Sequence, residues 1–90
     1  MRRRMYAVVF TRKAAKQIEA LDAGVRKEVA RIIEEEIAHD PRCGKPLQGP
    51  LKGMFSRRVG RLRIVYRAQK QELIIFVIAV EHRKSVYKQR

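Results

Sequence analysis

The stretch from Arg61 to Arg67 alternates two kinds of side chain with a period of two residues. Apolar groups take one set of positions and mainly arginines take the other: Leu62, Ile64 and Tyr66 against Arg61, Arg63, Val65 and Arg67. Successive side chains of a β-strand point to opposite faces of its sheet, so this pattern predicts an antiparallel strand with one buried and one solvated face. The solvated face of this strand is basic.

Two further strands are expected on either side of this one. Residues 55–59 alternate in the same way, and Gly60 marks the turn between the two strands. Residues 73–80 are apolar without interruption, which is typical of a central strand covered on both faces.

The first half of the chain predicts one more strand and two helices. Residues 6–10 are β-branched and aromatic, and Thr11 can cap the helix that follows. A second helix is expected from about Val25 to His39, and its glutamate run, residues 34–36, is expected to be a solvated surface. The apolar face of this helix consists of Val25, Val29, Ile32, Ile33 and Ile37.

The expected fold class is α+β, with the order β-α-α-β-β-β and a C-terminal helix or irregular segment. A mixed, antiparallel-rich sheet with the helical hairpin packed on one face is the economical arrangement. The length of 90 residues suits a single domain, with residues 1–4 as a candidate disordered basic extension and residues 40–53 as a loop. We expect a cytoplasmic location, because no apolar run reaches the roughly 20 residues of a membrane span. Cys43 is the only cysteine and reads as a plain loop thiol.

The charge is strongly and unevenly basic. The chain holds 22 Lys and Arg against 9 Asp and Glu, a formal net charge of +13. Residues 1–45 carry 11 basic and 7 acidic side chains, whereas residues 46–90 carry 11 basic and only 2 acidic ones. Such an excess favours a polyanionic partner, and it places the binding face in the second half.

The residue types of the last third suit cleavage of an RNA backbone by its own 2′-hydroxyl. That reaction needs cations at the phosphate and groups that move protons. Arg58, Arg63 and Arg83 can supply the charge, and Tyr87 or His82 can handle protons. We expect neither a metal nor another cofactor, because no Asp, Glu, His and Cys set has ligand-like spacing. Taken singly, the aromatic residues and the histidine have commoner structural roles. Tyr66 is expected to be a core residue, Tyr87 a packed aromatic near the terminus and His82 a surface histidine.

The chain resembles the RelE/ParE superfamily of toxins from toxin–antitoxin operons. The resemblance begins at Met5 and covers nearly the whole chain. It is carried by residues 11–14, 44–47 and 61–67, and it ends in residues 80–87. The spacing of His82, Arg83 and Tyr87 is similar to that of the RelE branch. The resemblance implies a ribosome-dependent endoribonuclease, an mRNA interferase that cuts messenger RNA in the ribosomal A site by metal-independent 2′-hydroxyl attack. It also implies a cognate antitoxin as partner, contacts with the ribosome and messenger RNA, and no membrane.

Family roles carry over to matching positions only. The implied catalytic residues are Arg58, Arg63, Arg83 and Tyr87. The expected RNA-binding residues are Lys52, Arg57, Arg61, Arg67, His82 and Lys84. Ser56 departs from the pattern, since some members have a lysine there, and this leaves the identity of the general base open.

Two other functions remain compatible with the sequence. A ParE-like gyrase inhibitor would share the fold without nuclease activity. A non-catalytic nucleic-acid-binding module would use only the basic face of the sheet, with an affinity that falls steeply with salt.

Overall fold

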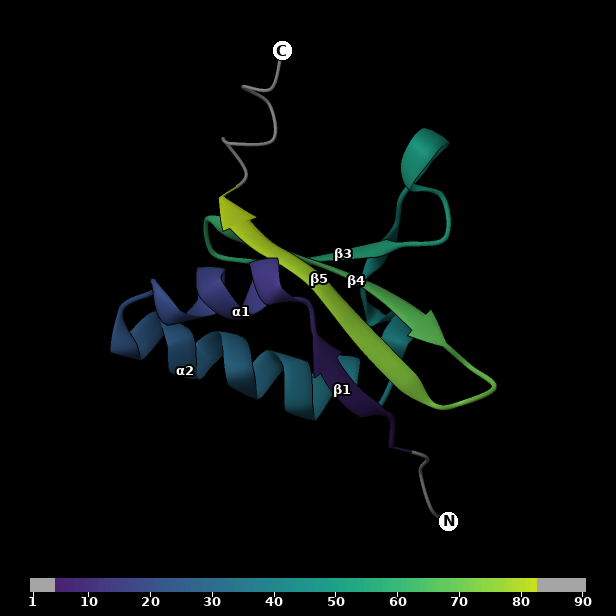
Figure 1. The fold of residues 1–90 in the computed structure, drawn as a ribbon, viewed down its shortest axis with the longest axis horizontal. Coiled ribbons are helices and arrows are strands. Elements are labelled where there is room, and N and C mark those ends of the chain that lie inside the picture. Colours follow the sequence, from purple (N-terminus) through teal and green to yellow (C-terminus); the bar gives the residue numbers. More distant parts are fainter. Residues whose placement is uncertain (1–4, 83–90) are drawn as a thin grey trace.

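The computed structural model describes residues 5–82, and the fold is α+β as the sequence predicts. Figure 1 shows two helices on one side of a twisted sheet. The elements are β1 (Ala7–Phe10), α1 (Arg12–Glu19), α2 (Ala23–Ile32), a π-helical turn (Ile33–Ile37), a 3₁₀ turn (Pro41–Cys43), β2 (Lys45–Pro46), a 3₁₀ turn (Gly49–Leu51), β3 (Phe55–Val59), β4 (Leu62–Gln69) and β5 (Ile74–His82). Within these residues, no helix has the length and apolar content needed to cross a membrane.

The five strands form one mixed sheet in the order β1-β5-β4-β3-β2. β1 runs parallel to β5, and the other neighbours are antiparallel. The two-residue β2 was not expected, because residues 40–53 carry the turn composition of a loop. The strand nevertheless forms, since Lys45 and Pro46 pair with Ser56 and Phe55 at the start of β3.

The core lies between the helices and one face of the sheet. Thr11 caps α1 as predicted, because its Oγ1 accepts the Ala14 N–H at 3.1 Å. Val25 departs from its expected place: it is 38% exposed, whereas the other four apolar positions of that helix are buried. The core residues are Ala14, Val29, Ile32, Ile33, Ile37, Leu62, Ile64, Tyr66, Ile75, Val77 and Val80.

A β-bulge in β5 changes which residues face the helices. Val65 pairs with Ala79 while Tyr66 pairs with Val77, so Ile78 is the extra residue. The first turns of α1 hold this bulge: Thr11 Oγ1 donates to the Ile78 carbonyl at 2.8 Å, and the Val80 N–H donates to Gln17 Oε1 at 2.7 Å. Beyond the bulge, Glu81 therefore shares a face with its partner Arg63, and His82 shares the opposite face with Leu62.

Candidate functional site

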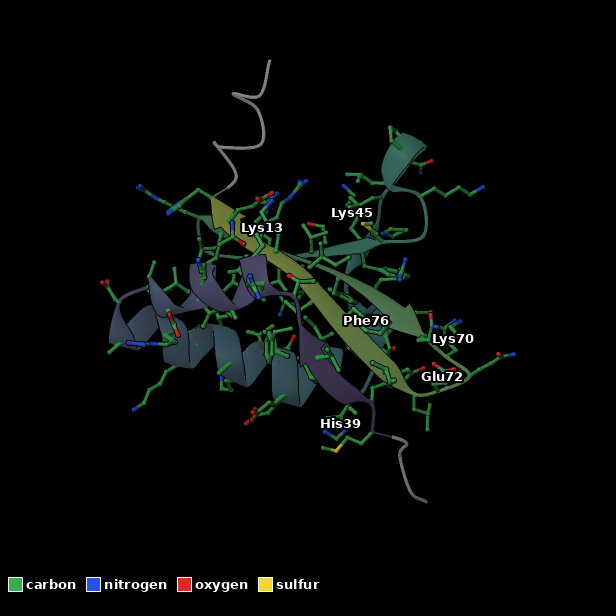
Figure 2. The ribbon with its side chains drawn as sticks, in the orientation of Figure 1. Lys13, His39, Lys45, Lys70, Glu72 and Phe76 are labelled. Carbon is green, nitrogen blue, oxygen red and sulfur yellow. The ribbon has the colours of Figure 1, made fainter. Side chains whose placement is uncertain are left out.

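We call the sheet face turned away from α1 and α2 the open face. Directly paired residues of neighbouring strands present their side chains on the same face. Register therefore places Lys45 beside Ser56 and Val65, and Arg58 beside Arg63, all on the open face. The basic outer face predicted for the central strands is thus present, and β2 extends it with Lys45. Figure 2 labels Lys45 at the side of the sheet where β2 and β3 lie.

A hollow of about 640 Å³ lies along the edge of β3, and we call it the basic hollow. β2 covers β3 only at Phe55 and Ser56, so the hollow receives side chains from both faces of the uncovered part. Its lining combines four cations with one carboxylate and several neutral groups: Lys45, Arg57, Arg58, Arg63, Glu36, Cys43, Pro46, Leu47, Gln48 and Ser56. Such a lining suits an anion.

Arg58 and Arg63 stand together in this lining, and Glu81 of β5 is the other register partner of Arg63. They are register partners across β3 and β4, and no carboxylate of the described residues forms an ion pair with either. The Arg63 Nε is buried and has no hydrogen-bond partner within residues 5–82. Like charges directly opposite on a sheet are destabilising, so the pair favours an anion that binds both guanidinium groups.

Arg57 behaves differently, although it lines the same hollow. Its Nη2 donates to Glu36 Oε1 at 2.5 Å, and its Nη1 donates to the Arg58 carbonyl at 2.7 Å. Hydrogen bonding to Glu36 is the main reason why the pKa of Arg57 is raised. Arg57 is thus partly neutralised within the fold, while Arg58 and Arg63 are available.

Glu36 corrects an expectation from the sequence. The glutamate run was expected to be a solvated helix surface, yet Glu36 contacts Arg57 and lines the basic hollow. Glu36 lies in the π-helical turn that follows α2, on the side of the helix that faces β3. A sequence signal existed: Glu36 follows Val29 by seven residues and Ile32 by four, which is the spacing of the apolar stripe.

Lys45 was also missing from the predicted site residues, and Tyr66 and Gly44 position it. The Tyr66 hydroxyl donates to the Pro41 carbonyl and accepts the Gly44 N–H at 3.1 Å. A Cβ on Gly44 would lie 2.5 Å from that hydroxyl oxygen, so only glycine fits there. Burial raises the pKa of Tyr66, which is fully buried as the sequence predicts. The Gly44-Lys45-Pro46 motif was the signal for this arrangement.

The remaining predicted RNA-binding residues are dispersed. Arg67 lies on the open face of β4, with its guanidinium carbon 5.8 Å from the ring centroid of its register partner Phe76 (labelled in Figure 2). Lys52 is exposed after the second 3₁₀ turn and does not line the basic hollow. Arg83, Lys84 and Tyr87 lie outside the described residues, so their roles stay predictions.

Arg61 and His82 line a second hollow of about 620 Å³, which we call the apolar hollow. It lies between the α1–α2 turn and the β3–β4 turn, with Leu21, Val25 and Val59 among its lining residues. The structure therefore does not bring His82 to Arg58 and Arg63. In residues 5–82, three or more His, Cys, Asp or Glu side chains do not gather at one point in a way that could hold a metal.

The mixed sheet with two helices on one face and a hollow lined by four cations defines an α+β protein with a candidate anion site, and comparison with known proteins supplies its family. Residues 8–87 match the family described as the ParE toxin of the type II toxin–antitoxin system. Toxin RelG of Mycobacterium tuberculosis is 31% identical over 84 residues, which cover 92% of this chain and 97% of that protein. Toxin RelE of the same organism is 27% identical, with 92% of this chain and 87% of that protein covered. The chain belongs to the RelE/ParE superfamily of toxins from type II toxin–antitoxin systems, as the resemblance predicts.

Solved structures agree with this assignment. The toxin–antitoxin complex RelBE2 of Mycobacterium tuberculosis contains a chain with a TM-score of 0.81 and 31% identity, over 88% of this chain and 99% of that one. The isolated RelE toxin of E. coli gives a TM-score of 0.73 at 25% identity, over 91% and 90% of the two chains. The RelE-like fold predicted from the sequence is thereby confirmed.

Proposed function

We propose that this toxin is a ribosome-dependent endoribonuclease that cuts messenger RNA in the ribosomal A site by metal-independent attack of the 2′-hydroxyl. Family membership and the relatives named RelG and RelE support the proposal. The single observation that carries it is the Arg58–Arg63 pair, which lines the basic hollow without a described carboxylate partner.

The geometry suits the charge that develops on phosphorus. A phosphate seated between Arg58 and Arg63 accepts hydrogen bonds from two strands whose register is fixed by the sheet. Such preorganised donors stabilise the transition state with little reorganisation, and the loss of one typically costs about 100- to 1000-fold in rate. Lys45 adds a third cation at the hollow. The resemblance adds Arg83 as a further phosphate ligand and Tyr87 as a proton-transfer group.

A cognate antitoxin is the proposed regulator. Solved structures similar to this chain include toxin–antitoxin complexes from Mycobacterium tuberculosis, E. coli and Methanococcus jannaschii. An acidic segment laid over the basic hollow would neutralise Arg58 and Arg63 and exclude RNA. The ribosome and messenger RNA as targets place the proposed site of action in the cytoplasm.

Primer extension on ribosome-bound messenger RNA tests the proposal. Wild-type protein should produce cuts within the A-site codon, and the upstream fragments should end in a 2′,3′-cyclic phosphate. Tyr87→Phe should cut more slowly, because it lacks the phenolic proton. Intact messenger RNA after incubation with folded wild-type protein on programmed ribosomes contradicts the proposal.

Gyrase inhibition is the second candidate, because the matching family carries the ParE description. It requires no cleavage chemistry and leaves the Arg58–Arg63 pair without a catalytic task. A supercoiling assay beside a cell-free translation assay separates the two candidates. Inhibited supercoiling with normal translation favours the gyrase reading, and arrested translation with normal supercoiling favours the nuclease.

A further inference from the structure

Glu36 is the one acidic side chain among the described residues that line the basic hollow. The π-helical turn carries it there from the end of α2, while Ile33 and Ile37 of the same turn remain buried in the core. The neighbouring Glu35 pairs instead with Arg31 on the solvent side, at 3.4 Å. One turn of helix therefore sends two glutamates to two different environments.

Arg57 fixes the orientation of the Glu36 carboxylate. The guanidinium group binds Glu36 Oε1 and is itself anchored by the Arg58 carbonyl, so the ion pair bridges the helical layer and the edge of β3. The Glu36 side chain keeps 36% of its surface exposed, and Oε2 forms no hydrogen bond with a residue of the described range. One carboxylate oxygen is thus held and the other is open to a ligand in the hollow.

The other lining groups are poor proton acceptors at neutral pH. Lys45, Arg58 and Arg63 are hydrogen-bond donors without an acceptor, and the Ser56 hydroxyl requires a base of its own. The Cys43 thiol stays protonated, because burial raises its pKa. His82 lies in the apolar hollow. Glu36 contributes the carboxylate of the hollow's lining and is therefore the available base.

We propose that Glu36 is the catalytic proton acceptor, a role that rests on the proposed ribonuclease function. As the 2′-oxygen forms its bond to phosphorus, the 2′-hydroxyl proton passes to the Glu36 carboxylate and the bond from phosphorus to the 5′-oxygen breaks. The departing 5′-oxygen takes a proton from solvent or from an acidic group outside the described residues, and Glu36 then returns its proton to solvent. This assignment gives the hollow a base although Ser56 stands where some relatives have a lysine.

Single-turnover cleavage of ribosome-bound messenger RNA by Glu36→Gln is the primary test. The amide oxygen still accepts a hydrogen bond from Arg57, so the hollow keeps its shape, but the amide does not take a proton. The rate should fall about 100-fold or more, with messenger affinity unchanged. The acid limb of the pH–rate profile, where wild type slows as its base becomes protonated, should be lost. The matched control Glu35→Gln removes an ion-paired carboxylate outside the hollow and should cleave like wild type.

A double-mutant cycle separates proton transfer from simple positioning of Arg57. If Glu36 accepts the proton, Glu36→Gln slows cleavage about 100-fold also in an Arg57→Ala background. If Arg57→Ala reproduces the whole loss and the double mutant is no slower, Glu36 acts only through Arg57 and the assignment is overturned. Glu36→Asp keeps a carboxylate and should recover part of the rate, whereas equal losses in the Asp and Gln variants also overturn it.

The outcomes distinguish this inference from the function beneath it. Cleavage by wild type together with full activity of Glu36→Gln overturns the inference and leaves the nuclease intact. Absence of cleavage by wild type overturns both.

Discussion

The two hollows described in this molecule have nearly equal volumes, about 640 and about 620 Å³, but opposite chemistry. The basic hollow lies along β3, where a two-residue β2 leaves three of the five strand residues uncovered. The apolar hollow lies between two turns, and its polar and charged groups, including Arg61 and His82, stand among apolar side chains. Arginine by itself therefore does not define the site, since the β3–β4 hairpin sends Arg58 and Arg63 to one hollow and Arg61 to the other.

The difference shows that the pairing register of β3 and β4 determines which hollow each of these arginines lines. Arg58 and Arg63 lie beside each other because they are directly paired across β3 and β4. Arg61 precedes β4 and belongs to the turn between the two strands. If the comparison is right, changes at the basic hollow should affect RNA chemistry, and matched changes at the apolar hollow should not.

The largest expected effect is a loss of cleavage rate in the Arg63→Ala variant. Removal of one preorganised donor should lower the cleavage rate about 100- to 1000-fold, because the charge on phosphorus loses a ligand from β4. Primer extension over a time course on ribosome-bound messenger RNA measures the rate. Arg61→Ala removes the same charge from the apolar hollow and should retain most of the activity. Equal losses in the two variants would erase the distinction between the hollows.

The next effect concerns stability and also compares the hollows. Gly44→Ala places a Cβ against the Tyr66 hydroxyl and should reduce the free energy of unfolding by about 1–3 kcal/mol. Gly24→Ala, at the apolar hollow, meets no atom within 4 Å and should be neutral or stabilising by up to about 1 kcal/mol. Urea denaturation followed by circular dichroism measures both.

A second substitution isolates the cause of the Gly44 effect. Tyr66→Phe removes the oxygen that a Cβ on residue 44 would meet, so the double variant should lose less stability than the sum of the two single losses. Strict additivity would show that the Tyr66 hydroxyl is not what requires glycine at this position.

A smaller effect is expected on the salt dependence of RNA binding. Lys45→Gln should make the plot of log affinity against log salt shallower by about 0.7, the value for one phosphate contact on single-stranded nucleic acid. Binding of a labelled RNA oligonucleotide at several salt concentrations measures this slope. Lys27→Gln removes an equal charge from the exposed side of α2 and should leave the slope unchanged. A change of the same size in both variants would mean that net charge alone drives binding.

The smallest expected effect is on the reactivity of Cys43 at the basic hollow. Burial raises the pKa of this thiol, so less thiolate is present at pH 8 than for free cysteine, whose pKa is about 8.5. Alkylation by iodoacetamide should therefore be several-fold slower than for free cysteine and should accelerate as the pH rises. A bound RNA oligonucleotide should slow it further, because Cys43 lines the hollow. Alkylation as fast as free cysteine, or unaffected by RNA, would contradict this placement.

Much of the fold followed from patterns between residues close in the chain. The alternation in residues 61–67 predicted β4 and its basic face, the apolar run after residue 72 predicted the central strand β5, and Thr11 predicted the start of α1. Such features depend on the two-residue period of a strand or on the first turn of a helix, so neighbouring residues suffice to specify them. The excess of basic residues in the second half of the chain is likewise evident from the sequence without the structure.

The composition of the site required contacts between residues far apart in the chain. The bulge at Ile78 depends on Thr11 and Gln17, and it decides that Glu81 rather than His82 lies beside Arg63. The ion pair of Glu36 with Arg57 joins the helical layer to β3, 21 residues further along the chain. One inserted residue in a strand exchanges the faces of the side chains that follow, and tertiary packing determines where that insertion is accommodated. The sequence by itself thus determined which elements form and where the charge lies, and only the tertiary structure decided which charged groups meet.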